Sequence, residues 1–225
     1  MSQKVTFFID GKPLKARPGD KILWAALDNG IYIPNLCAIR EQELPFGACR
    51  LCFVEIEGRP LPVTACTEPV AEGIHVITRS ERVDQLRRTA LELLLSHHDT
   101  DCKHCTKNRS CGLQYLSKVL KVPLKPKRLR QLPTEMPIDS SHDRIVLNPN
   151  RCVLCGKCIW VCKEQEKIGA IDFVLRGLST RIAPFGLEPL AESACTGCEK
   201  CVDICPTGAL TRKEASSLEN KTDNP

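Results

Sequence analysis

The first thirty residues have the pattern of a strand hairpin followed by a helix. Lys4–Asp10 (KVTFFID) is rich in β-branched and aromatic residues, which favour a strand, and Gly11-Lys12 predicts the turn after it. Pro13–Arg17 is expected to return as the second strand. Asp20 is expected to cap a helix whose apolar period stops at Asn29-Gly30.

Three more short strands are predicted before residue 80. Leu51–Glu57 and Leu61–Ala65 pair around a Gly-Arg-Pro turn, and Gly73–Thr78 supplies the last strand. Two strands, a helix and further strands around a long cysteine-bearing loop predict a β-grasp, ferredoxin-like domain over residues 1–79.

The next segment has helical periodicity. Thr78 and Glu81 have the spacing of a capping box, and apolar residues then keep a helical period to His97. A cysteine-rich turn precedes a second short helix over Gly112–Val122, so a small helical domain is expected over residues 80–122. Four prolines mark a linker over residues 123–143: Pro123, Pro126, Pro133 and Pro137.

The C-terminal third contains an internal repeat. The motif from Cys152 to Cys162 (CVLCGKCIWVC) reappears from Cys195 to Cys205 (CTGCEKCVDIC), and a Gly-Ala pair that opens a predicted strand follows each copy. The duplication predicts a pseudo-twofold domain over residues 144–212, with a polar tail over residues 213–225. The expected fold class is therefore α+β.

Composition favours metal sites over a large conventional core. The 225 residues include 15 Cys, all between Cys37 and Cys205, whereas aromatic residues are only 4%. Small domains with little core are held by other means, and an odd cysteine count argues against a closed set of disulfides. No signal peptide is visible, and no stretch reaches the ~20 apolar residues that span a bilayer. A cytoplasmic protein is expected, where clustered thiols usually bind metal.

Basic residues concentrate in one segment. Between Cys102 and Thr134 there are nine Lys or Arg and no acid, within a chain of formal net charge +5. Nucleic-acid binding would require interleaved aromatic residues or a known module, and only Tyr115 is aromatic there. A solvated linker or a face that docks a partner is favoured instead.

Both copies of the repeat have the ligand spacing of iron–sulfur clusters. Thiolates are the soft ligands that these clusters require, and in two-cluster ferredoxins the fourth Cys of a C-x2-C-x2-C-x3-C run binds the other cluster. The crossed assignment gives one [4Fe–4S] cluster to Cys152, Cys155, Cys158 and Cys205, and the other to Cys195, Cys198, Cys201 and Cys162. Pro206 follows the signature, whereas Lys163 departs from it. Two zinc sites are the alternative, although zinc usually takes pairs of C-x2-C.

The N-terminal set is Cys37, Cys49, Cys52 and Cys66. One cysteine, a close pair and a fourth beyond a hairpin fit a [2Fe–2S] cluster in a β-grasp loop, although the first gap is longer than in the plant-type spacing. Gly47-Ala48 would let backbone amides approach the sulfurs. Structural cysteines or zinc are the alternative.

The middle set has three cysteines, Cys102, Cys105 and Cys111, and its nearest further ligand is His97 or His98. On this segment alone, a His-ligated [4Fe–4S] cluster and a structural zinc bound by three Cys and one His are equally consistent. The total number of candidate ligands in the chain favours the cluster over zinc, because 15 Cys and one His make four sets of four with no cysteine left over.

In this order, the four motifs resemble the N-terminal half of [FeFe]-hydrogenases, the large iron–sulfur subunit of respiratory complex I and NAD-linked formate dehydrogenases. In size the chain is most similar to the small iron–sulfur (diaphorase) subunit of soluble NAD(P)-coupled hydrogenases. The resemblance covers residues 3–212, including Cys111-Gly-Leu-Gln and the stretch from Gly169 to Gly177. It implies that His98, Cys102, Cys105 and Cys111 hold a [4Fe–4S] cluster. Complex I members often lack the first three Cys of the last motif, so their presence here favours the hydrogenase and formate dehydrogenase branches.

The resemblance implies an electron-relay subunit with one [2Fe–2S] and three [4Fe–4S] clusters and no catalytic residues of its own. Its expected partners are a flavin subunit that oxidises NAD(P)H and the catalytic subunit of a [NiFe] hydrogenase. A formate dehydrogenase, or an electron-bifurcating complex that uses ferredoxin, is the alternative. Only twenty residues follow Cys205 and no nucleotide-binding glycine motif is present, so a relay without a reaction centre is expected. His75 and His142 are expected to be structural, and a zinc-stabilised interaction scaffold is the alternative from another class.

Overall fold

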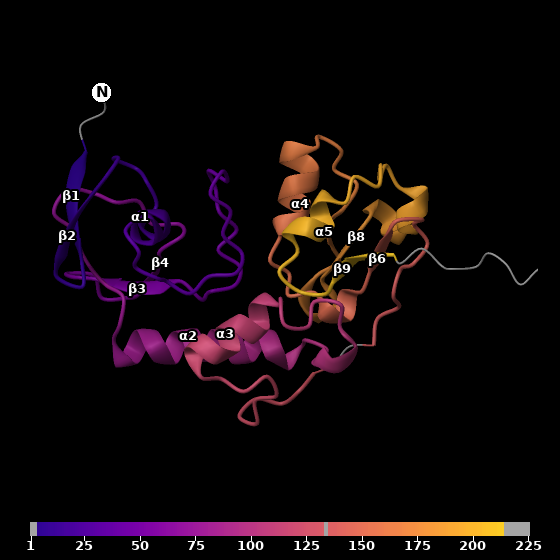
Figure 1. Ribbon diagram of the computed structural model, residues 1–225, viewed down its shortest axis with the longest axis horizontal. Helices are drawn as coiled ribbons and strands as arrows, with labels where there is room; N and C mark the ends of the chain where they lie inside the picture. Colours follow the sequence, from indigo (N-terminus) through magenta and orange to yellow (C-terminus); the bar gives the residue numbers. More distant parts are fainter. Residues whose placement is uncertain (1–3, 133–134, 214–225) are drawn as a thin grey trace, which may run out of the picture.

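The computed structural model describes residues 4–132 and 135–213, which form three units in chain order. The N-terminal sheet and the C-terminal unit stand side by side, and helices α2 and α3 run beneath them (Figure 1). The long loop between α1 and β3 lies on the side of the N-terminal unit that faces the C-terminal unit (Figure 1). The first cysteine-bearing loop therefore lies at a junction and not at an outer face.

The N-terminal unit is a five-stranded sheet with the order β2-β1-β5-β3-β4. The central pair, β1 and β5, is parallel, and the other neighbours are antiparallel. Helix α1 (Ile22–Asp28) packs Ile22, Leu23 and Ala26 into the core of this sheet. The strands are β1 (Val5–Ile9), β2 (Lys12–Ala16), β3 (Phe53–Ile56), β4 (Val63–Thr64) and β5 (His75–Ile77).

Two local details of this unit differ from the sequence prediction. The first hairpin turns at Asp10-Gly11, one residue earlier than predicted, because Ile9 pairs directly with Lys12. Both loop residues have positive φ, 50° and 77°, as two-residue hairpin loops require to follow the strand twist. Asp20 does not cap α1, since its carboxylate accepts instead from the Arg17 amide at 3.0 Å.

The helical unit consists of α2 (Glu81–Ser96), the single turn η1 (Cys102–His104) and α3 (Gly112–Leu120). The predicted capping box at Thr78 is wrong: the N-cap is Ser80, whose hydroxyl accepts from the Val83 amide at 3.2 Å. Thr78 is engaged elsewhere, because its amide and hydroxyl donate to the Asp10 carboxylate at 2.7 and 2.6 Å. These bonds tie the start of α2 to the first hairpin.

The segment predicted as a linker packs back on the other units. The Arg128 side chain pairs with Glu92 of α2, and the Leu132 amide donates to the Ser96 carbonyl at 2.8 Å. Asp139 forms an isolated bridge with Leu147. Pro133, which marks this segment in the sequence, lies outside the described residues.

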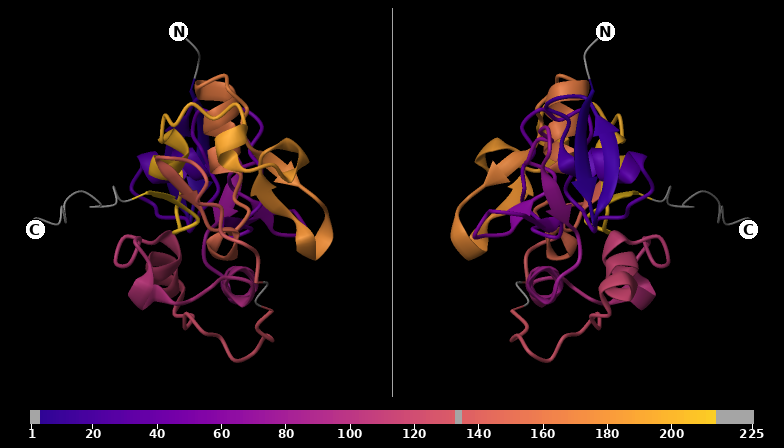
Figure 2. Two further views of the ribbon diagram at one scale, coloured as in Figure 1. Left: turned by 90° about the vertical axis from the view of Figure 1, so that its right-hand side faces the viewer. Right: turned by 90° about the vertical axis from the view of Figure 1, so that its left-hand side faces the viewer.

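The C-terminal unit contains two two-stranded sheets, β6 with β9 and β7 with β8. The predicted strand after the second Gly-Ala pair is β9, whereas in the first copy Gly169–Ile171 is not a strand and β7 begins one residue later. The β7–β8 hairpin projects from this unit (Figure 2). The strands are β6 (Ile145–Leu147), β7 (Asp172–Val174), β8 (Arg181–Ala183) and β9 (Leu210–Arg212), and the helices are α4 (Lys157–Trp160) and α5 (Lys200–Ile204). Five further single turns complete it: η2 (Pro149–Arg151), the π-helical η3 (Val161–Gln165), η4 (Gly177–Ser179), η5 (Phe185–Leu187) and η6 (Leu190–Glu192).

The repeat is visible in the backbone of the two cysteine motifs. The residue before each helix is left-handed, Gly156 with φ 77° before α4 and Glu199 with φ 62° before α5. Lys213, expected in the polar tail, still bonds to the unit, because its amide donates to the Arg144 carbonyl at 2.8 Å. The rest of the predicted tail lies outside the described residues.

The three units share one of the three hydrophobic cores. This core joins residues of the N-terminal loops, of α2 and α3, and of the first C-terminal motif, including Leu36, Cys37, Leu51, Leu91, Leu95, Leu113, Leu116, Val153 and Cys155. The Gly112 amide donates to the Pro206 carbonyl at 2.8 Å, and a Cβ at Gly112 would lie 2.7 Å from Leu36 Cδ1. Units that the sequence separates are therefore packed without room for a side chain between them. Among the described residues, no helix is both long and apolar enough to cross a membrane.

Candidate metal centres

The four N-terminal cysteines converge on one buried site. Cys37, Cys49, Cys52 and Cys66 are each no more than 3% exposed. Hydrogen bonds from the Cys49 and Cys66 thiols lower the pKa of Cys37, and a bond from Cys66 lowers the pKa of Cys52. These hydrogen bonds link all four sulfurs, although the cysteines come from two loops and the end of a hairpin.

Backbone amides approach the sulfurs of this site. Gly47 has φ 60°, and the chain turns so that the amides of Ala48 and Cys49 hydrogen-bond the Cys37 sulfur, the latter at 3.5 Å. The Leu51 amide bonds the Cys49 sulfur in the same way. Amide donors stabilise negative charge on sulfur, which is the property that a thiolate ligand needs.

The middle cysteines lie together at the turn between α2 and α3. Burial raises the pKa of Cys111, with further contributions from the neighbouring Cys105 and Cys102. Cys105 lies against the C-terminal unit, because a Cβ at Gly208 would be only 2.6 Å from its sulfur.

Two histidines at the end of α2 differ in a way that the sequence could not distinguish. His97 is the C-cap residue of α2, whereas Nδ1 of His98 is buried and has no hydrogen-bond partner. Burial lowers the pKa of His98 to about 4, so its ring is neutral at neutral pH. A neutral imidazole with an unpartnered ring nitrogen fits a metal ligand. His104, which the motif spacing did not consider, is exposed and lies 2.7 Å from the Asp101 carboxylate.

The two C-terminal motifs line two separate apolar pockets. One is lined by Cys152, Cys155 and Cys158 of the first motif together with Cys205 of the second. The other is lined by Cys195, Cys198 and Cys201 of the second motif together with Cys162 of the first. Each motif thus contributes its fourth cysteine to the pocket of the other copy.

Burial dominates the acid–base properties of these cysteines. It raises the pKa of Cys152 and of Cys201 to about 12 and that of Cys155 to about 11. Without metal these thiols keep their protons at neutral pH. Metal ligation requires thiolates, so loading of the pockets displaces those protons.

The four cysteine groups are close enough to influence one another. Burial is the main cause that raises the pKa of Cys155 and of Cys158, and small further contributions come from Cys37 of the N-terminal site and from Cys201 of the second C-terminal pocket respectively. Cys105 of the middle group reaches Gly208, beside the pocket that holds Cys205. The pocket of Cys152, Cys155, Cys158 and Cys205 is therefore the one that adjoins all the others.

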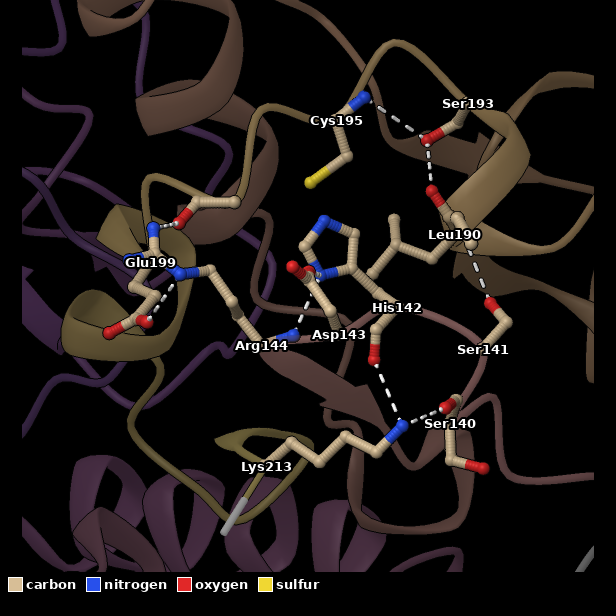
Figure 3. A network of polar contacts seen from close by, with 12 residues as sticks. Ser140, Ser141, His142, Asp143, Arg144, Leu190, Ser193, Cys195, Glu199 and Lys213 are labelled. Atoms are coloured by element: carbon tan, nitrogen blue, oxygen red, sulfur yellow. Dashed lines mark hydrogen bonds and ion pairs between the residues drawn. The ribbon is translucent and has the colours of Figure 1, made fainter. Parts of the chain in front are cut away.

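Two polar residues that the sequence did not predict pack against the second C-terminal motif. His142 is only 7% exposed, and the side chain of Cys195 points toward its ring (Figure 3). A Cβ at Gly197 would lie 3.0 Å from both His142 and Arg144, and the Arg144 side chain donates to the Gly197 carbonyl at 3.0 Å. Both residues precede β6, so no spacing within the cysteine motif could indicate them. His75, by contrast, stacks on Phe8 in the sheet with ring centroids 4.3 Å apart.

Within the described ranges, no group of three or more His, Cys, Asp or Glu side chains is arranged around a single metal-ion position. The donors are instead gathered as four sets rich in cysteine sulfur, which range from the fully buried N-terminal set to the second C-terminal motif, where Cys198 is exposed. Such donor sets are those of iron–sulfur proteins.

The comparisons with known families agree with this chemistry over nearly the whole chain. Residues 2–81 match a 2Fe-2S iron-sulfur cluster binding domain. Residues 87–123 match the NADH-ubiquinone oxidoreductase-G iron-sulfur binding region, and residues 143–211 match the ferredoxin-like domain of NADH-quinone oxidoreductase subunit 3.

A solved structure, an NAD⁺-reducing [NiFe]-hydrogenase in the H₂-reduced state, contains a chain of the same fold. It is 33% identical with a TM-score of 0.86, and the match covers 96% of this chain and 90% of that chain. The fold and the donor sets define an iron–sulfur protein. The chain belongs to the family of multi-cluster iron–sulfur relay subunits to which the matching hydrogenase chain belongs.

Longer curated relatives contain a region similar to this chain. The NADP-reducing hydrogenase subunit HndD of Solidesulfovibrio fructosivorans is 36% identical over 93% of this chain, and the NADPH-Fe(3+) oxidoreductase subunit alpha of Geobacter sulfurreducens is 38% identical over 93%. The chain spans only 36% and 24% of those relatives.

The contact between Gly208 and Cys105 gives a testable prediction. Gly208→Ala would place a methyl group within 2.6 Å of the Cys105 sulfur, so the backbone or the thiol must move. We expect a loss of ~1–3 kcal/mol in the free energy of unfolding, as for other overpacked sites, and less iron bound per chain. Thermal unfolding and anaerobic iron analysis measure both.

The control is Gly169→Ala, at the glycine of the Gly-Ala pair that follows the first copy of the repeat. No atom lies within 4 Å of a Cβ there, but its φ of 67° imposes backbone strain. This variant should lose stability and keep its iron. Equal iron contents in the two variants would show that the Gly208 contact does not position Cys105.

Proposed function

We propose that this chain relays single electrons through one [2Fe–2S] and three [4Fe–4S] clusters. The observation that carries the proposal is the exchange of fourth cysteines between the two apolar C-terminal pockets, which is the arrangement of two-cluster ferredoxins. A zinc-stabilised scaffold has no need of this exchange, because zinc usually takes its four ligands as two close pairs.

The assignment uses every cysteine of the chain. Cys37, Cys49, Cys52 and Cys66 bind the [2Fe–2S] cluster, and His98, Cys102, Cys105 and Cys111 bind one [4Fe–4S] cluster. The other two [4Fe–4S] clusters are bound by Cys152, Cys155, Cys158 and Cys205, and by Cys195, Cys198, Cys201 and Cys162. When bound, the clusters supply one-electron redox chemistry.

The chain's own residues set the surroundings of that chemistry. Leu147, Ile182 and Leu210 line the first C-terminal pocket and exclude water from its thiolates. The Ala48, Cys49 and Leu51 amides hold negative charge on the sulfurs of the N-terminal site. Exposure and hydrogen bonding to sulfur are the main protein controls on cluster potential, so the sites are expected to differ in potential.

The relatives indicate the kind of complex in which the relay works. One is a subunit of an NADP-reducing hydrogenase, and the solved structure is an NAD⁺-reducing [NiFe]-hydrogenase. We propose that the partners here are a flavin subunit that exchanges electrons with NAD(P)H and the catalytic subunits of a [NiFe] hydrogenase, in the cytoplasm. A formate dehydrogenase, or a bifurcating complex with ferredoxin, is the second candidate. The relatives that share this region are subunits of different oxidoreductases and extend far beyond it, so the region by itself does not specify one terminal substrate.

Metal and sulfide analysis tests the proposal directly. One [2Fe–2S] and three [4Fe–4S] clusters contain about 14 iron and about 14 sulfide ions per chain. The anaerobically purified full-length chain should contain these amounts, be brown and bleach on reduction with dithionite. A colourless protein that contains mainly zinc would overturn the relay.

The exchange of fourth cysteines predicts reciprocal effects of two substitutions. Cys162→Ser should alter the electron paramagnetic resonance (EPR) signal of the cluster bound by Cys195, Cys198 and Cys201, although Cys162 belongs to the other motif. Cys205→Ser should alter the signal of the cluster bound by Cys152, Cys155 and Cys158. Each variant serves as the control for the other. If each substitution perturbed only the cluster of its own motif, the crossed assignment would be wrong.

The choice between the two histidines is tested at the middle site. His98→Cys should keep a [4Fe–4S] cluster at a lower potential, because a thiolate adds a negative charge that a neutral imidazole lacks, as in the comparison of Rieske and all-Cys centres. His98→Ala should lose or degrade the cluster. Redox titration followed by EPR measures both effects.

His97→Ala is the matched control, since His97 is the neighbouring C-cap residue of α2. It should leave the middle cluster and its potential unchanged. Loss of the cluster in His97→Ala with retention in His98→Ala would exchange the roles of the two residues. An intact cluster in both variants would mean that the three cysteines have another partner.

A further inference from the structure

Helix α2 buries an arginine against the N-terminal cysteine site. Arg87 is 2% exposed, although the neighbouring Arg88 is exposed to solvent. One terminal nitrogen of Arg87 donates to the Phe53 carbonyl at 2.5 Å. Phe53 directly follows Cys52, so the guanidinium is held at the chain segment that carries a predicted cluster ligand.

The polar partners of Arg87 offset its charge only in part. Asp84 is 3.9 Å away across one helical turn, and its side chain is 37% exposed, so water weakens this contact without removing it. Nε of Arg87 is buried and has no hydrogen-bond partner. A guanidinium in this position is costly to bury unless another negative charge lies near.

Few groups around Arg87 can supply the missing negative charge. The pocket that Arg87 lines is also lined by Arg79, Arg88 and Lys121, all cationic, and Asp84 is the one carboxylate among its lining residues. Burial lowers the pKa of Arg87, Arg79 lowers it further, and Asp84, Cys52 and Asp10 act in the opposite direction. Of these three acidic groups, Cys52 belongs to a site where four sulfurs gather.

We propose that Arg87 is the buried counter-charge of the [2Fe–2S] site and that it raises the reduction potential of this cluster. This inference rests on the proposed function, because it requires the cluster to be present. A core of about +2 with four thiolates has a net charge of about −2, and reduction adds one more negative charge. A fixed cation in a region of low dielectric favours the reduced form over the oxidised form.

The role is one of positioning and tuning, not of ligation. Arg87 holds its place through the Phe53 carbonyl, and α2 supplies the rigid element that keeps the charge at a fixed distance from Cys52. The same helix ends at Ser96, two residues before His98, so it would connect two neighbouring redox sites through one rigid support. The charge on Arg87 is permanent near neutral pH, so the effect should not depend on pH there.

Redox titration of the full chain, followed by the EPR signal of the [2Fe–2S] cluster, tests the proposal. Arg87→Gln should lower the midpoint potential of this cluster, because it removes the cation. Arg87→Lys should keep the potential close to that of the unmodified chain, because it keeps the charge. Arg88→Gln is the matched control on the same helix and should leave the potential unchanged, since this side chain is solvated.

Asp84→Asn provides a second test in case the substitutions of the buried Arg87 prevent folding. Its side chain is partly exposed, and removal of its charge leaves Arg87 less compensated, so the midpoint potential should rise. The signals of the [4Fe–4S] clusters provide an internal reference in every variant.

Two results would overturn the role of Arg87. Unchanged midpoint potentials in both Arg87→Gln and Asp84→Asn would show that Arg87 does not tune the cluster by its charge. If Arg87→Gln did not fold, an unchanged potential in Asp84→Asn would be enough to show this. Equal shifts in Arg87→Gln and Arg87→Lys would assign the effect to the bond with Phe53 and not to charge. Absence of any [2Fe–2S] signal from the unmodified chain would instead refute the proposed function.

Discussion

The burial of cysteine sulfur in apolar surroundings is the constraint on which this structure depends. In the shared core, Cys37, Cys49, Cys111 and Cys155 are packed among leucines of the N-terminal loops and of α2 and α3, together with Val153 of the C-terminal unit. An apolar environment resists the formation of thiolate, and it is acceptable only where metal, amides or cations compensate the charge. The short sheets and helices therefore serve mainly to bring such compensating groups to the sulfurs.

The interlocking of the units follows from the same constraint. Gly112, Gly156 and Gly208 each lie where a Cβ would meet another unit or loop, at 2.7 Å from Leu36, 2.6 Å from Phe46 and 2.6 Å from Cys105 respectively. At these three points the absence of a side chain allows the sites to approach one another. Close approach of redox sites is what a relay requires, so the packing of the units and the proposed function impose the same demand.

The sequence predicts the parts of this structure that are encoded locally. The strands of the N-terminal sheet, the three main helices and the clustering of the cysteines along the chain follow from short-range pattern and spacing, because each depends on residues that are close in sequence. The cap at Ser80, the turn at Asp10-Gly11 and the fold-back of residues 123–143 do not, since competing partners such as Thr78 for Asp10 decide them. His142 and Arg87 are beyond the reach of motif spacing for a related reason: they lie on other elements and meet the cysteine sites only after the chain has folded.

The exchange of cysteines between the two C-terminal pockets also has a consequence for biosynthesis. The first pocket contains Cys205, so it remains open on one side until the ribosome has synthesised almost all of the described chain. The second pocket takes Cys162 from the earlier motif, so its four cysteines are all present only once Cys201 has been synthesised. Neither pocket can therefore be completed from the first motif alone, and both acquire their last cysteine late in the synthesis of the described chain.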